Sequence, residues 1–193
     1  MEWVVTTGKT IDEAKGRALD QLGLAERTVL VFMSDNGGTS VTSMAPLRGI
    51  KATLYEGGIR VPFVVSWKGH IAGGRCYDHP VISLDVAATA VALAGLPADA
   101  GLDGVNLIPY LSGVAEGAPH DTLYWRWIAQ SAVREGRWKF LRGGAREYLF
   151  DLSVDAEEKH NLLDDHPDVA SRLRADLAAW AEQLSPPGLE TRP

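Results

Sequence analysis

The sequence predicts an α/β protein in which a partial sheet with helices is followed by a small lobe of antiparallel strands packed on a long helix. Two mainly apolar runs without polar alternation, 28–33 and 60–67, are typical of strands buried on both faces in a parallel sheet. From about residue 121 the pattern changes to short strands separated by turns, and residues 167–184 carry a helical apolar stripe. We therefore expect an α/β part followed by a smaller α+β lobe.

The N-terminal region predicts a short strand over 3–5 and then a helix over about 11–22. Thr10 and Glu13 have capping-box spacing, with Thr10 as the cap and Glu13 reaching back to the backbone N–H of the cap. Gly23 is placed to end this helix in a left-handed conformation.

A second helix is expected after the strand 60–67, which tolerates Pro62 near its start. Ser83 is the predicted cap of this helix, which runs through Ala94 and ends before Gly95 and Pro97.

The C-terminal lobe is expected to contain a small antiparallel sheet, with Glu135-Gly136 as a hairpin turn. Its predicted strands are 123–127, 131–133, 138–141 and 147–152. Pro167 opens the final helix, whose stripe we interpret as core packing. The stripe consists of Val169, Leu173, Leu177, Trp180 and Leu184. Residues 185–193 are expected to be disordered.

Composition limits the classes of function. The 193 residues are 46% hydrophobic, enough for a real core. The net charge of -6 comes from 19 basic and 25 acidic residues that are well mixed, so no nucleic-acid partner is expected. The chain as written shows no signal peptide and no apolar run of membrane-spanning length, which predicts a cytoplasmic protein without a membrane partner.

Asp35 and Asn36 follow the first apolar run directly and precede Gly37 and Gly38. In open α/β sheets ligands gather at the carboxyl ends of strands. Carboxylate and amide oxygens suit Ca²⁺ or Mg²⁺, and the glycines would let the backbone approach a bound group. The alternative is an ordinary Asp-Asn-Gly turn.

Lys51 lies in the second candidate segment, 47–62, where cations, hydroxyls and glycines crowd before the strand 60–67. A lysine there could contact an oxyanion as a point charge. The alternative is a solvated loop with an Arg-Glu pair.

The segments SDNGG, LRGIKATLYEGGIRVP, PVISLDVAATAVALAGLP and LDGVNLIPYLSG, followed by AVREGRWKFL and EYLFDLSVDAEEKHNL, resemble the sulfatase family in the same order. The likeness covers about residues 16–184. It implies a partial alkaline-phosphatase-like sheet, with Asp35 and Asn36 as ligands of Ca²⁺ or Mg²⁺ and Lys51 holding a sulfate oxygen of a sulfate ester. This reading makes 25–120 the C-terminal part of the catalytic α/β domain and 121–184 the family's C-terminal lobe.

The family's nucleophile is a formylglycine made from cysteine in a C-x-P-S-R or similar motif, and these 193 residues contain no such motif. Cys76 lacks the required Pro and Arg and follows the metal turn, so we reject it as the nucleophile. His79, His120, His160 and His166 could each be nominated as a general acid, but surface or packing roles are favoured.

Residues 2–24 also resemble the start of the Jag N-terminal domain, through TGKTIDEA and ALDQLGL. Because 16–24 fits both families, we interpret 1–24 as a Jag-like or sulfatase-like helix segment with a fusion junction between about 15 and 24. No RNA function is carried over from this short piece.

Three functions remain open at this stage. The first is sulfuric ester hydrolysis, which the chain is expected not to perform alone. The second is a noncatalytic remnant or binding module with weak metal or sulfate affinity, and the third is part of a related phosphonate or phosphodiester hydrolase. A sheet lacking neighbouring strands would expose edges and apolar faces, which predicts a homodimer or a marginal monomer.

Overall fold

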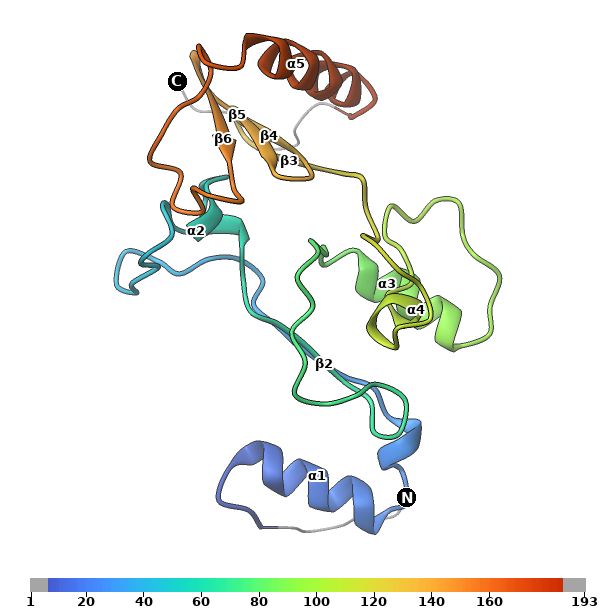
Figure 1. Cartoon of the computed structure of the whole chain (residues 1–193). Helices are drawn as coiled ribbons and strands as arrows, with labels where there is room; N and C mark the ends of the chain where they lie inside the picture. Colours follow the sequence, from blue (N-terminus) through green and yellow to red (C-terminus); the bar gives the residue numbers. More distant parts are fainter. Residues whose placement is uncertain (1–6, 186–193) are drawn as a thin grey trace. The chain divides into compact units, whose positions relative to one another are not determined.

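The computed structural model describes residues 7–185, which form two compact units (Figure 1). One unit contains the chain up to Met33 and Pro62–Pro119, and the other contains Ser34–Val61 and the chain from His120 onward. This grouping places 34–61 with the C-terminal lobe, whereas the division expected from the sequence placed them in the α/β part, 25–120. The strand expected at 3–5 and the predicted tail from 186 lie outside the described residues.

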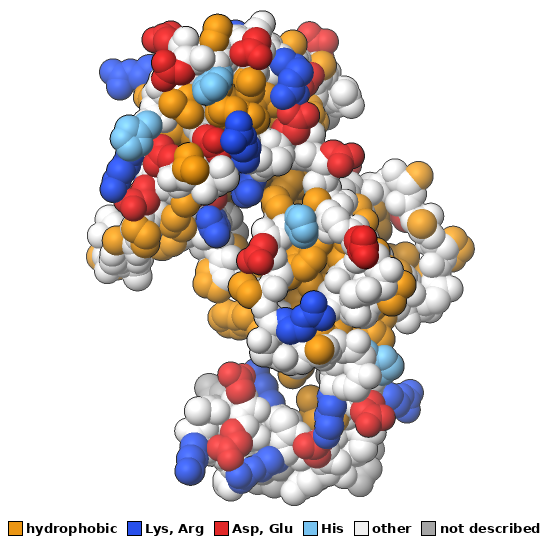
Figure 2. Space-filling model, in the orientation of Figure 1, with side chains coloured by type: hydrophobic (Ala, Val, Ile, Leu, Met, Phe, Trp, Pro, Cys, Tyr) orange, Lys and Arg blue, Asp and Glu red, His pale blue; other side chains and the backbone are white. Residues whose placement is uncertain are grey.

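The first unit begins with helix α1 (Ile11–Gln21). Thr10 is its N-cap as predicted, and its hydroxyl accepts from the Glu13 backbone N–H at 3.1 Å. The Glu13 carboxylate accepts from the Lys9 backbone N–H at 2.6 Å rather than from the cap itself, one residue away from the predicted partner. Gly23 has φ 65, as expected for a glycine after a helix end. Figure 2 shows acidic and basic side chains interspersed over α1.

A 3₁₀ turn, η1 (Ala25–Arg27), leads into strand β1 (Leu30–Met33), which pairs with β2 (Phe63–Ser66). The pairing is antiparallel, so the expected parallel arrangement is wrong for these two strands. All four residues of β1 are exposed, because among the described residues its sheet contains two strands. An apolar run without alternation predicted burial on both faces, but the described residues of this unit leave all four residues of β1 exposed.

Helix α3 (Asp85–Leu93) starts two residues after its predicted cap Ser83. Asp85 is fully buried, and its carboxylate accepts from the backbone N–H groups of Ile82 and Val105, both at 2.9 Å. The carboxylate therefore serves backbone donors outside the helix, and the N-cap position is Leu84, without the side-chain cap expected from Ser83. Gly95 has φ 68 and follows the helix end as predicted.

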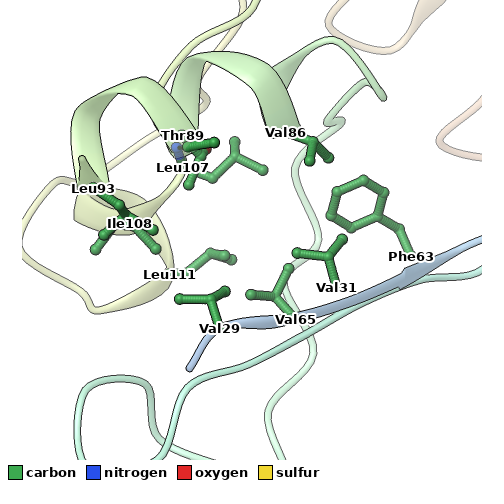
Figure 3. Close-up of a pocket in the computed structure, with 11 residues that line it drawn as sticks. Val29, Val31, Phe63, Val65, Val86, Thr89, Leu93, Leu107, Ile108 and Leu111 are labelled. Carbon is green, nitrogen blue, oxygen red and sulfur yellow. Dashed lines mark hydrogen bonds between the residues drawn. The ribbon is translucent and has the colours of Figure 1, made fainter. Parts of the chain in front are cut away.

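A cavity of about 160 Å³ lies between the β1–β2 pair and the helices α3 and α4 (Ile108–Leu111). Its lining is aliphatic and aromatic apart from Thr89, whose hydroxyl accepts from the Leu107 backbone N–H at 3.0 Å (Figure 3). The cavity therefore offers apolar contact and no titratable group.

The second unit is built on a four-stranded antiparallel sheet, as predicted, and its strand order is β3-β4-β5-β6. The strands are β3 (Thr122–Trp127), β4 (Gln130–Glu135), β5 (Trp138–Gly143) and β6 (Arg146–Asp151). Gly136 has φ 55 in the predicted hairpin turn between β4 and β5.

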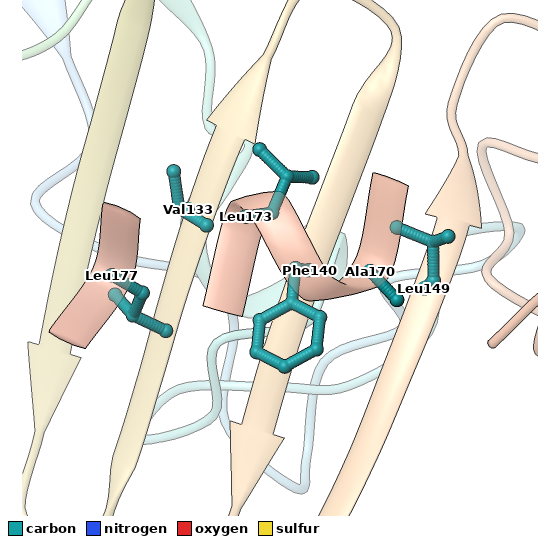
Figure 4. Packing of buried hydrophobic residues seen from close by; sticks show 6 residues of the cluster. All are labelled: Val133, Phe140, Leu149, Ala170, Leu173 and Leu177. Carbon is teal, nitrogen blue, oxygen red and sulfur yellow. The ribbon is translucent and has the colours of Figure 1, made fainter. Parts of the chain in front are cut away.

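Helix α5 (Pro167–Glu182) packs on one face of this sheet (Figure 4). The buried cluster between them contains Val133, Phe140, Leu149, Ala170, Leu173 and Leu177, with Val169 and Trp180 partly buried against it. The helical stripe is therefore core packing, as predicted.

The opposite face of the sheet is covered by residues 54–59, which include the short helix α2 (Glu56–Ile59). Leu54 is buried against Ala132 and Leu141, with Tyr55 and Ile59 packed around them. Both faces of the sheet are thus occupied, one by α5 and the other by the segment that carries the predicted site residues. None of the helices within 7–185 combines the length and the apolar character needed to cross a membrane.

Candidate active site

The turn after β1 carries the two predicted metal ligands. Asp35 is exposed and Asn36 is half-buried. The Ser34 hydroxyl donates to the Asn36 carbonyl at 2.8 Å, which fixes the turn from within. A free carboxylate and an amide therefore stand side by side in the chain on an ordered turn.

Glycines bring this turn against the segment 57–58. The Gly37 backbone N–H donates to the Gly58 carbonyl at 2.9 Å. A Cβ on Gly37 would overlap the carbonyl oxygen of Gly57, so this close approach requires glycine. The sequence predicted glycines for the approach of a bound group, and in the structure they permit the approach of another backbone segment.

Lys51 belongs to the loop that lies beside the turn. Its side chain is exposed, and its backbone N–H donates to the Gly38 carbonyl at 2.8 Å. The next residue, Ala52, has φ 68, a conformation that costs a non-glycine residue free energy and is common near functional sites. The structure therefore holds the Lys51 backbone against the turn that carries Asp35 and Asn36.

The C-terminal sheet holds this loop through Gln130, the first residue of β4. Its side-chain amide donates to the Ala52 carbonyl and accepts from the Leu54 backbone N–H, both at 3.2 Å. The Gln130 side chain thus provides hydrogen-bond partners for the Ala52 carbonyl and the Leu54 N–H. These two groups follow Lys51 directly in the chain.

A buried group of three charged side chains lies under α2, and we call it the charge triad: Glu56, Lys139 and Glu158. The Lys139 ammonium lies 2.8 Å from Glu56 Oε1 and 2.9 Å from Glu158 Oε1. The second contact is an ion pair whose angles miss hydrogen-bond geometry. Lys139 and Glu158 are 0% exposed, and Glu56 is 2% exposed.

Glu158 has unusual backbone and electrostatic features. Its φ is 55, and its carbonyl accepts from the Arg48 guanidinium at 2.9 Å. Its Oε2 accepts from the Glu56 backbone N–H at 2.6 Å. Burial raises the pKa of the Glu158 carboxyl, and the nearby Lys139 charge opposes that rise.

The chemistry of Asp35 and Asn36 suits a hard cation, because both offer oxygen ligands. Ca²⁺ typically binds about six to eight oxygen ligands. Residues 7–185 contain no group of three or more His, Cys, Asp or Glu side chains that could hold a metal. The two residues therefore fit as part of a coordination shell and not as a whole one.

The other sequence candidates include Cys76, His160 and His166. Cys76 is exposed. The His160 Nδ1 lies 3.5 Å from Asp155 Oδ2, and the ring of His166 lies 4.9 Å from that of Trp138. These contacts agree with the surface and packing roles favoured from the sequence.

Sequence reasoning missed the charge triad and Gln130. Lys139 stands between two aromatic residues in a strand, and a lysine at such a position is usually assigned to a solvated face. Glu56 of the segment 54–59 and Glu158 lie against the Lys139 ammonium, and all three residues are buried.

Comparison with known proteins identifies the family. A family profile described as Sulfatase matches residues 6–96. Steryl-sulfatase of Mus musculus is 32% identical over 237 residues, covering 91% of this chain and 37% of that protein. Arylsulfatase A of Homo sapiens is 33% identical over 180 residues, covering 76% of this chain and 35% of that protein. The uncharacterized sulfatase YdeN of Escherichia coli (strain K12) is 35% identical and covers 92% of this chain.

Solved structures give the same result for the fold. The complex of Ps i-CgsB with k-i-k-neocarrahexaose matches with a TM-score of 0.80 and 29% identity, covering 90% of this chain and 40% of that one. BT1596, a 2-O GAG sulfatase, matches with a TM-score of 0.73 and 25% identity, covering 86% of this chain and 39% of that one. The predicted fold class is confirmed.

The profile match begins at residue 6, inside the segment 2–24 that also resembles the Jag domain. The Jag likeness and the fusion junction stay predictions. The chain spans about two fifths of the length of relatives such as YdeN and Ps i-CgsB. The profile, the relatives and the shared fold together show that the chain belongs to the sulfatase family.

Proposed function

We propose that this chain contributes part of a site for sulfuric ester hydrolysis. In this proposal Asp35 and Asn36 hold Ca²⁺ or Mg²⁺, and the Lys51 ammonium binds a sulfate oxygen of the substrate. The observation that carries the proposal is the 2.8 Å hydrogen bond from the Lys51 backbone to Gly38, which fixes the lysine loop beside the metal turn.

Each side chain has a distinct task. The Asp35 carboxylate supplies negative charge to the cation, and the Asn36 amide supplies a neutral oxygen. Lys51 is a compact positive charge on a flexible stem, suited to a tetrahedral oxyanion. When bound, the divalent cation would offset negative charge that develops on the ester oxygens.

We propose that residues 1–193 alone do not hydrolyse sulfate esters. They contain no C-x-P-S-R type motif, and Cys76 is not a substitute. Alone, the chain would act as a binding module with weak affinity for the cation and for sulfate. A role in a phosphonate or phosphodiester hydrolase rests on the same three side chains and is distinguished by which anion is preferred.

The first experiment is an NMR titration of the chain with CaCl₂ and, separately, with inorganic sulfate, phosphate and methylphosphonate. We expect Asp35→Asn to abolish the shifts that Ca²⁺ causes at residues 34–38 and Lys51→Ala to weaken the response to sulfate. Asp12→Asn and Lys15→Ala, exposed residues on α1, are the matched controls. Equal responses in the test and control variants would reject the assigned roles.

The second experiment is an aryl sulfatase assay with CaCl₂ under conditions that detect slow turnover. We expect no turnover from the wild-type chain. Turnover that is lost in Lys51→Ala would show that the chain holds a complete site and that the proposed inactivity is wrong.

We also propose that the chain self-associates through the β1–β2 pair. The four residues of β1 are apolar, and their exposed fractions run from 38% for Met33 to 67% for Phe32. A short unpaired strand edge with apolar faces is a common site of association.

A further inference from the structure

We infer that Lys139, Glu158 and Gln130 of the C-terminal lobe are positioning residues for the candidate site. They touch neither the cation nor the anion. They fix the backbone that carries Lys51 and that holds the turn of Asp35 and Asn36. The inference deepens the proposed function and rests on it for the identity of the ligands.

The charge triad is the first anchor. Glu158 Oε2 accepts the backbone N–H of Glu56 at 2.6 Å, while Lys139 reaches the Glu56 carboxylate at 2.8 Å. Glu56 is thus held by its backbone and its side chain at the first residue of α2. Because all three residues are at most 2% exposed, water does not compete for these contacts.

Two backbone contacts connect this anchor to the site. Gly58, two residues after Glu56, accepts the Gly37 N–H at 2.9 Å. Gly57 donates to the Arg48 carbonyl at 2.7 Å, three residues before Lys51. A shift of α2 would therefore move Gly58, which accepts from Gly37, and the Arg48 end of the lysine loop. Gly37 must follow, because Gly57 and Gly58 lie directly against it.

Gln130 is the second anchor, and it acts on the other end of the lysine loop. Its two hydrogen bonds fix Ala52 and Leu54, and Leu54 is buried against the sheet. The strained Ala52 is thereby held in place directly after Lys51. The loop is clamped at both ends by the same sheet.

Stability alone does not explain a buried charge triad at this position, since well-packed apolar groups of similar size often stabilise a core as well or better. Directional contacts to a backbone N–H and to a carboxylate specify one placement of α2, which apolar contacts would not do. Burying three ionisable groups together costs desolvation, and the positioning role accounts for that cost.

The test is native-state hydrogen exchange on the full chain, with the Gly37 and Lys51 amides compared with the β4 amide of Val133. Glu158→Ala is expected to raise exchange at Gly37, relative to Val133, by about tenfold or more. Glu158→Gln keeps an acceptor for the Glu56 N–H but places its NH₂ group toward Lys139, so it should raise the ratio less than Glu158→Ala does. Leu173→Ala weakens the core that contains Val133, on the face of the sheet opposite to residues 54–59, so it should not raise exchange at Gly37 relative to Val133.

Gln130→Ala keeps the test decisive if Glu158→Ala does not fold, because Gln130 is half-buried and its loss leaves the core intact. It should raise exchange at Lys51, relative to Val133, by about threefold or more. Ratios within a factor of about two of wild type in both Ala variants would overturn the inference.

A Ca²⁺ titration of the same variants separates positioning from general stability. The dissociation constant should rise by about tenfold in Glu158→Ala, rise less in Glu158→Gln and stay at the wild-type value in Leu173→Ala. Equal affinity in all folded variants would overturn the link to the metal turn. If the wild-type chain binds no Ca²⁺, the proposed metal site fails, and the exchange ratios alone decide whether the lobe positions the loop.

Discussion

Replacing Lys139 by Met tests the energetics of the charge triad. Met has a similar volume and length, so the change leaves little cavity and isolates the loss of charge. Two carboxylates, of Glu56 and Glu158, would then be left buried without the cation that now lies 2.8 and 2.9 Å from them. Removing one partner of a buried ion pair typically costs about 3 to 5 kcal/mol, so we expect a loss in that range at neutral pH.

The loss should depend on pH in a defined direction. Burial raises the pKa of Glu158 in the folded chain, so this group favours folding below its unfolded-state pKa, and that contribution is lost as pH rises through the folded-state pKa. Without Lys139 the nearest positive charge no longer compensates the ionised Glu158 carboxylate. The destabilisation should therefore be largest above the folded-state pKa of Glu158 and should shrink on acidification.

Urea unfolding followed by tryptophan fluorescence at several pH values measures both effects. Lys139→Met combined with Glu158→Gln is the matched variant, since it removes one of the two unpaired charges and should recover part of the loss. Arg172→Gln, which breaks an exposed pair with Glu135, should cost at most about 1 kcal/mol. A loss for Lys139→Met as small as that of Arg172→Gln, at every pH, would refute the reasoning.

Three further predictions follow from the fold. Phe32→Asp should shift the chain toward monomer in size-exclusion chromatography with light scattering; a wild-type monomer at high concentration would contradict the proposed association. Gly37→Ala should lower the thermal midpoint because its Cβ has no room beside Gly57, whereas Gly16→Ala, in open space on α1, should stabilise by up to about 1 kcal/mol. Leu173→Ala should cost about 2 to 5 kcal/mol in urea unfolding, and a value near zero would mean that the α5 interface is not a close-packed core.

Local sequence patterns predicted most of the secondary structure. The Thr10 cap, the left-handed Gly23 and the turn at Gly136 each depend on a few neighbouring residues, which the sequence displays directly. The α5 stripe was equally clear because a long helix repeats its signal over several turns.

Long-range arrangement was harder to predict. The apolar run of β1 gave no information about strand direction or about how much of the chain would cover it, so its antiparallel pairing and exposure were missed. Likewise the positions of Asp35, Asn36 and Lys51 made them candidates, but their local pattern also matched ordinary loops, and the family resemblance favoured the site. Lys139 and Glu158 are 19 residues apart, and Glu56 is 83 residues before Lys139, so no local spacing connects them.

The charge triad also limits where this protein can be recombined. A chimera joined at the start of the C-terminal lobe, near His120, would import a new Lys139 and Glu158 while leaving Glu56 and Arg48 from the old parent. Such hybrids should not fold stably unless both parents have these four residues. A junction before residue 24 leaves the set undisturbed, so the lobe and residues 34–61 are inherited as one unit even though they are separated in the sequence.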